Sequence, residues 1–117
     1  MEKEEIEPVE YVYNTVDSTS LKAFVFSPQI ECDTTRLPAI VIFHGGGWAI
    51  GEPSWAFARA RHFASKGMIA VAGQYRLSNQ RDITPIDAMR DARTIIRWMR
   101  RNADSLHIDQ NSIVAYG

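Results

Sequence analysis

The pattern of apolar and polar residues divides this chain of 117 residues into five predicted strands and two predicted helices. Residues 39–43, 68–72 and 112–117 form short, mostly apolar runs without polar alternation. That pattern is typical of strands buried on both faces of a parallel sheet. Residues 10–15 and 21–26 are also rich in strand-forming residues, and the turn-like stretch between them predicts an antiparallel hairpin.

Two helices are predicted between the parallel strands. Residues 55–66 carry apolar side chains at helical spacing and are followed by a glycine that ends the segment. The second helix begins with Thr84 and Pro85, has Asp87 three residues after the cap, and extends to about Ala103. Because strand, helix and strand follow one another, we expect right-handed parallel crossovers.

The second predicted helix separates apolar from basic side chains. Its apolar stripe consists of Ala88, Ala92, Ile95, Ile96, Trp98 and Met99. Its opposite face carries the arginines, which are Arg93, Arg97, Arg100 and Arg101. We expect this face to be solvated, because no basic stripe elsewhere in the chain supports a nucleic-acid partner.

Asp91 lies inside the apolar stripe of that helix, one turn before Ile95. A buried carboxylate is costly when it has no partner. We therefore expect Asp91 to be mostly buried, with Arg76 as its favoured charged partner or with backbone N–H donors. A role as the catalytic acid is the weaker interpretation.

Composition narrows the classes of function. The chain has 13 basic and 14 acidic residues, and this balance gives no sign of a polyanion or membrane-surface partner. Cys32 is the only cysteine, and the charged start at residues 1–5 does not look like a signal peptide. The three histidines, His44, His62 and His107, are too scattered for a metal site. We expect one cytoplasmic domain over residues 1–117, without a cofactor.

A run of three glycines follows the central apolar run directly, in the sequence His44-Gly45-Gly46-Gly47-Trp48. Glycine clusters most often form only flexible turns. Here, however, they stand at the carboxyl end of a buried strand and leave their N–H groups uncovered by side chains. Loops of the HGGG type supply oxyanion-hole N–H groups in lipases and esterases. A phosphate-binding loop is not favoured, because no Gly-Lys-Ser/Thr sequence follows.

With this loop, the chain resembles the α/β-hydrolase superfamily, and within it the hormone-sensitive-lipase-like and feruloyl-esterase-like carboxylesterases. The resemblance extends from about Val9 to Gly117. Its other matching motifs are Tyr75-Arg76-Leu77, Pro85 with Asp91 and Trp98, Ile108-Asp109, and residues 113–117. Two positions depart from the family pattern: Gln74 replaces a common aspartate, and Gln110 replaces a common proline.

The resemblance implies a mostly parallel α/β-hydrolase sheet with the strand order 1-2-4-3-5, and hydrolysis of small carboxylic esters by acyl transfer. It implies that Gly45, Gly46 and Gly47 form the oxyanion hole, with support from His44, Trp48, Arg76 and Asp91. Gly117 resembles the first glycine of a G-x-S-x-G nucleophile elbow. The catalytic serine is therefore expected two positions after Gly117, with the acid and the histidine later still, and the 117-residue chain alone is expected to be inactive.

Two alternatives stay open at this point. The chain can belong to a non-catalytic relative that binds a small ligand or a partner protein, because fold alone does not determine function. It can also be a truncated, inactive product. If the chain stops at Gly117, the last strand becomes an unpaired apolar edge, through which copies of the chain could associate.

Overall fold

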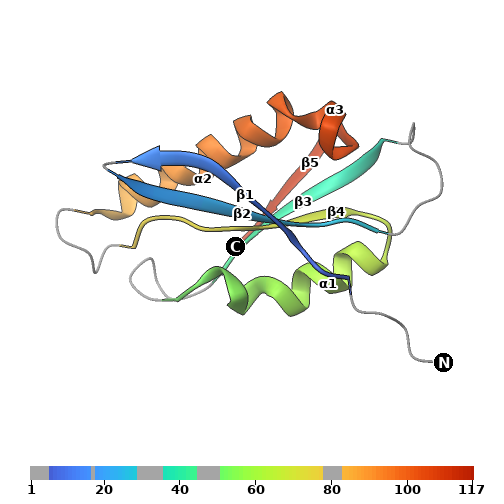
Figure 1. Cartoon of the computed structure of the whole chain (residues 1–117), viewed down its shortest axis with the longest axis horizontal. Coiled ribbons are helices and arrows are strands. Elements are labelled where there is room, and N and C mark those ends of the chain that lie inside the picture. Colours follow the sequence, from blue (N-terminus) through green and yellow to red (C-terminus); the bar gives the residue numbers. More distant parts are fainter. Residues whose placement is uncertain (1–5, 17, 29–35, 45–50, 78–82) are drawn as a thin grey trace.

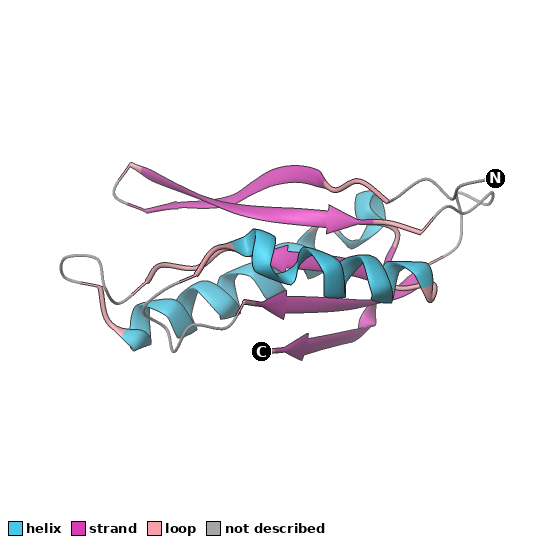
Figure 2. Cartoon of the chain, turned by 90° about the horizontal axis from the view of Figure 1, so that it is seen from below, coloured by secondary structure: helices cyan, strands magenta, loops and turns pink. Residues whose placement is uncertain are grey.

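The computed structural model describes residues 6–16, 18–28, 36–44, 51–77 and 83–117. Cys32 and the glycine loop with Trp48 lie outside the described residues. The described chain forms one mixed sheet of five strands, with helices on both of its faces (Figures 1 and 2). Because Gly45, Gly46 and Gly47 lie outside the described residues, their role in the oxyanion hole stays a prediction.

The strands lie in the order β1-β2-β4-β3-β5, which confirms the predicted order. β1 (Val9–Val16) and β2 (Thr19–Phe26) form the antiparallel hairpin, and β2 also pairs antiparallel with β4 (Ile69–Gly73). β3 (Leu37–Phe43) lies between β4 and β5 (Ile108–Tyr116) and runs parallel to both. The hairpin thus extends a parallel core at the β4 side, as predicted.

The two central strands are buried as their composition predicts. All five residues of β4 are buried, and so are the four consecutive residues 39–42 of β3. Helices cover both faces of these strands, so side chains on either face leave water. Continuous apolar runs without alternation are the expected result of such two-sided burial.

Helices lie on opposite faces of the sheet, with α2 on one side and α1 on the other (Figure 1). The predicted first helix is a 3-10 turn, η1 (Pro53–Ala56), that continues as α1 (Phe57–Ser65). α2 (Pro85–Arg101) begins where predicted and ends at Arg101, two residues earlier than expected. Asn102 follows as its C-cap and donates its side-chain amide to the carbonyl of Trp98. A short helix, α3 (Ala103–Leu106), follows it.

Small residues allow the helices to approach the sheet closely. On the α1 face, Ala60 and Ala64 pack with Ile40 and Ile42. On the α2 face, an added Cβ at Gly73 would lie 2.9 Å from Cδ1 of Ile95, which is too close for a real contact. A side chain at Gly73 would therefore require the end of the Ile95 side chain to move, because α2 lies close to the end of β4.

The last strand differs from the prediction in two ways. It begins at Ile108 rather than at Ser112, so part of the predicted loop is strand. The polar residues there fit because the β3–β5 register shifts between Leu37 and Ala39. The strand was also predicted to be buried, and this is wrong for its second half: Val114 is 53% and Tyr116 41% exposed. Their exposure follows from the place of β5, which pairs only with β3 at one side of the described sheet.

Candidate functional site

The candidate site lies where the parallel strands β3 and β4 end. Phe43, the last residue of β3, pairs in register with Gly73, the last residue of β4. His44 and the segment from Gln74 to Leu77 therefore leave the sheet side by side. In open α/β sheets, ligands bind at this carboxyl edge.

His44 and Tyr75 form a buried contact across this edge. The phenolic O–H of Tyr75 donates a hydrogen bond to the backbone carbonyl of His44, at 2.7 Å. The two rings are stacked, with centroids 4.5 Å apart and an interplanar angle of 13°. Burial raises the pKa of the Tyr75 phenol, which favours its protonated, donating form. His44 thus begins the glycine loop from a fixed position.

Trp55, the first aromatic residue after the glycine loop to be described, also contacts the ring of His44. Its ring meets the His44 ring edge to face, with centroids 6.1 Å apart. The Trp55 side chain is itself exposed. The imidazole of His44 therefore contacts two aromatic rings, those of Tyr75 and Trp55.

Arg76 and Asp91 form the ion pair that the sequence predicted, and Asp91 is 1% exposed. One carboxylate oxygen of Asp91 accepts the backbone N–H of Arg76 at 2.8 Å and its Nε at 3.0 Å. The other oxygen accepts Nη2 of Arg76 at 3.0 Å. The hydrogen bond to Asp91 is the main reason that the pKa of Arg76 is raised. Because both oxygens are used in this way, Asp91 connects α2 to the segment after β4.

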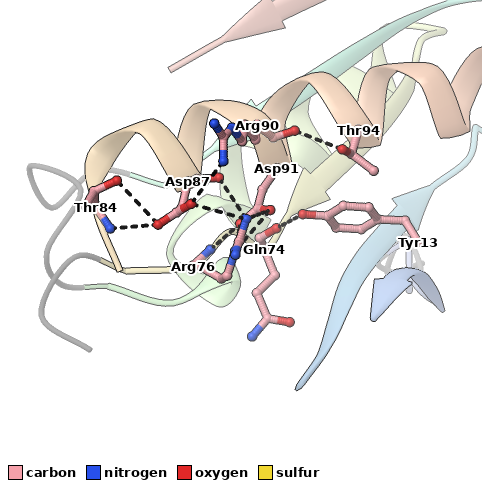
Figure 3. Close-up of polar contacts among 8 residues, drawn as sticks. All are labelled: Tyr13, Gln74, Arg76, Thr84, Asp87, Arg90, Asp91 and Thr94. Atoms are coloured by element: carbon pink, nitrogen blue, oxygen red, sulfur yellow. Dashed lines mark hydrogen bonds and ion pairs between the residues drawn. The ribbon is translucent and has the colours of Figure 1, made fainter. Parts of the chain in front are cut away.

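The first turn of α2 adds to this network (Figure 3). The carboxylate of Asp87 accepts the backbone N–H of Thr84 at 2.9 Å and lies 3.9 Å from Nη2 of Arg76. The hydrogen bond from the Thr84 backbone is the largest cause of the lowered pKa of Asp87, and Arg76 lowers it further. The same carboxylate thus caps the helix and faces the Arg76 guanidinium.

A second buried tyrosine, Tyr13 of the hairpin, was not predicted to reach this edge. Its hydroxyl donates to the backbone carbonyl of Gln74 (Figure 3). Gln74 also forms two hydrogen bonds with Lys22 of β2: its side-chain oxygen accepts the Lys22 N–H and its own N–H donates to the Lys22 carbonyl, each at 2.9 Å. Burial is the main cause that raises the pKa of Tyr13. The glutamine that departs from the family pattern therefore fixes the end of β4 to β2.

The other two histidines lie away from this edge. His62 is exposed on α1, and His107 follows α3 with a left-handed backbone, at φ 60°. Among the described residues, no group of three metal-binding side chains comes together, and no helix is long and apolar enough to cross a membrane. The described part of the site thus consists of the hydrogen-bonded backbone at His44 and Gln74 and the buried ion pair of Arg76 with Asp91.

Known proteins with similar sequences and structures include several esterases. The model of the BD-FAE family matches residues 25–117. Esterase 2 of Thermogutta terrifontis, in a structure phosphorylated by paraoxon, is 36% identical and superposes with a TM-score of 0.88 over 96% of this chain and 43% of that chain. Carboxylesterase NlhH of Mycobacterium tuberculosis is 32% identical over 102 residues, which are 85% of this chain and 30% of the relative.

One of the similar proteins is not named as an esterase. Neuroligin-like protein glit-1 of Caenorhabditis elegans is 33% identical over 104 residues, which are 87% of this chain and 13% of that protein. The chain thus spans less than half the length of each of these three relatives.

Proposed function

This chain belongs to the BD-FAE family of feruloyl-esterase-like α/β-hydrolases, and from that premise we propose that it is the amino-terminal part of a serine carboxylesterase. The reaction is the hydrolysis of a small carboxylic ester in two steps. A serine is first acylated by the ester, and water then hydrolyses the acyl-enzyme. The serine is expected two positions after Gly117, and the acid and histidine of the triad are expected later in the longer protein.

In this proposal the glycine loop is the oxyanion hole. The N–H groups of Gly46 and Gly47 stabilise the negative charge that develops on the carbonyl oxygen of the ester, and Gly45 gives the loop its shape. His44 and Trp48 flank the loop, while Arg76 and Asp91 support the edge of the sheet beside it. No step of this mechanism needs a cofactor.

The observation that carries the proposal is the position of His44. It stands at the carboxyl end of the central strand and is held there by the hydrogen bond from Tyr75 to its carbonyl. Oxyanion donors are effective only when they are organised before the reaction. A loop that begins from a buried and hydrogen-bonded residue meets that requirement better than a loop that begins from an exposed turn.

A second candidate is a binding module without catalysis. The likeness to a protein named neuroligin-like rather than esterase supports it, although this chain spans only 13% of that protein. Such a module would keep the same sheet and the same anchored edge and would bind a ligand or a partner protein. It would lack a reactive serine.

An esterase assay of the longer protein separates the two candidates. We expect it to hydrolyse p-nitrophenyl acetate and butyrate, and we expect a stoichiometric amount of paraoxon, which phosphorylates the related esterase, to abolish the activity. A folded longer protein that hydrolyses neither ester would favour the binding module. The 117-residue chain is the matched control, and it should give no hydrolysis above background.

A further inference from the structure

We propose that Tyr75 is a positioning residue for the oxyanion hole, which acts by fixing the peptide group between His44 and the glycine that follows it. This inference rests on the proposed esterase function and adds a residue to it. Tyr75 touches neither the ester nor the serine in this proposal. It acts on catalysis only through the backbone of the loop.

The contacts of the Tyr75 phenol support such a role. The phenol is buried, at 4% exposure for the residue, and its O–H donates to the His44 carbonyl at 2.7 Å. The ring stacks on the imidazole of His44 and receives the ring of Phe43 edge to face, with centroids 6.1 Å apart. Phe43 and His44 are the two residues that lead into the glycine loop. Tyr75 thus contacts both of them.

The backbone of Tyr75 is also held on both sides. Gln74 forms two hydrogen bonds with Lys22 of β2. Arg76 donates its backbone N–H to the buried carboxylate of Asp91 on α2. The segment that carries the tyrosine is thus fixed to a strand and to a helix. A donor mounted in this way can fix a second group, because it does not move with that group.

Fixing the His44 carbonyl has a direct consequence for the loop. A trans peptide is planar, so the direction of a carbonyl also determines the direction of the N–H in the same peptide group. Glycine has more backbone freedom than any other residue, and three glycines in succession can place their N–H groups in many directions. A fixed first peptide reduces that freedom at the entry to the loop. The oxyanion donors then need less reorganisation as the transition state forms.

The alternative is that Tyr75 only packs against His44. Tyr75→Phe tests this alternative because phenylalanine keeps the stacked ring and removes only the O–H. Tyr13→Phe is the matched control, since the Tyr13 O–H also donates to a backbone carbonyl, that of Gln74. Its loss leaves Gln74 with both bonds to Lys22 and leaves the His44 carbonyl untouched.

The experiment measures both variants in the longer protein with p-nitrophenyl butyrate. Active sites are counted by the p-nitrophenol released in a paraoxon burst, so that kcat refers to folded sites only. Direct loss of an oxyanion donor typically lowers kcat by about 10²–10³. Because Tyr75 acts through the backbone, we expect a smaller loss for Tyr75→Phe, of about ten-fold in kcat per site with KM within about two-fold. Tyr13→Phe should lower kcat per site much less than Tyr75→Phe does, because Gln74 keeps both of its hydrogen bonds to Lys22.

A second measurement compares two inhibitors. A trifluoromethyl ketone forms an oxyanion in the site and mimics the transition state, whereas butyrate mimics only the product. Tyr75→Phe should weaken the ketone about ten-fold more than it weakens butyrate. Equal weakening of both inhibitors, a loss of titratable sites alone, or an unchanged kcat per site would overturn the role of Tyr75. If the unmodified longer protein reacts with neither ester nor paraoxon, the esterase proposal itself fails, and the inference fails with it.

Discussion

Replacing Asp91 by alanine tests how far the edge of the sheet depends on its buried ion pair. The substitution removes the acceptor of the Arg76 backbone N–H and of its guanidinium in one step. The arginine cannot easily turn to water instead, because its side chain is only 14% exposed and its backbone N–H faces α2. Asp91→Ala therefore leaves a charged group and an N–H group buried without their main partner.

The size of the effect follows from this geometry. Breaking a buried pair by removing one partner costs about 3–5 kcal/mol. Hydrogen bonds to charged groups contribute about 1.5–3 kcal/mol each, and the simple sum of the bonds to Asp91 would exceed the cost of about 3–5 kcal/mol. The simple sum does not apply, because the bonds within one network are not additive. We expect a loss of about 3–5 kcal/mol in the free energy of unfolding, which corresponds to a urea midpoint about 2 M lower.

The assay is urea unfolding followed by far-UV circular dichroism. Asp104→Ala is the matched control, because Asp104 also pairs with an arginine, Arg36 at 3.5 Å, while its side chain is 98% exposed. Exposed pairs of this kind contribute about 0–1 kcal/mol, so the control should barely move the midpoint. The reasoning is refuted if the two variants shift the midpoint by the same amount.

Three further predictions concern packing, pH and association. Gly73→Ala places a Cβ 2.9 Å from Cδ1 of Ile95, the end of a flexible side chain, and should cost about 1 kcal/mol. Ile95→Val removes that atom and should recover part of the loss in a double-mutant cycle, and strict additivity would contradict the clash. The pKa of Asp87 is lowered in the folded state, so its contribution to stability is present above the unfolded pKa of about 4 and is lost as pH falls through the folded pKa. Asp87→Asn should therefore flatten the acid limb of the curve of stability against pH, and an equally steep limb argues against the cap. The 117-residue chain should associate as its concentration rises, through the exposed edge at Val114 and Tyr116. Val114→Lys should reduce this association in sedimentation velocity, whereas a chain that stays monomeric at every concentration rejects the prediction.

The sequence predicts most of the fold because its central elements carry strong local signals. The continuous burial of β4 follows from an apolar run flanked by turn residues, and the start of α2 follows from Thr84 and Pro85. The burial of Asp91 could be predicted because helical periodicity places it on the apolar stripe. Its pairing with Arg76 was only the favoured expectation, beside backbone N–H donors, since periodicity gives the face of a helix but not the residue opposite.

Other features depend on contacts that no local pattern reveals. The hydroxyl of Tyr13 reaches a carbonyl 61 residues later, and that of Tyr75 reaches one 31 residues earlier. Both contacts result from the register of strands that are distant in the sequence. The start of β5 was missed for a different reason: the polar residues after Ile108 have the composition of a loop, and only the shifted pairing with β3 accommodates them.

The central claim is that the glycine loop is the oxyanion hole of an esterase, and Gly46→Pro in the longer protein tests it most directly. Proline removes the N–H that is proposed to bind the oxyanion and fixes φ in the middle of the loop. Loss of one such donor predicts a decrease of about 10²–10³ in kcat, with a much smaller change in KM, for p-nitrophenyl butyrate. Full activity of Gly46→Pro, in a variant whose circular dichroism spectrum matches that of the unmodified protein, would contradict this claim.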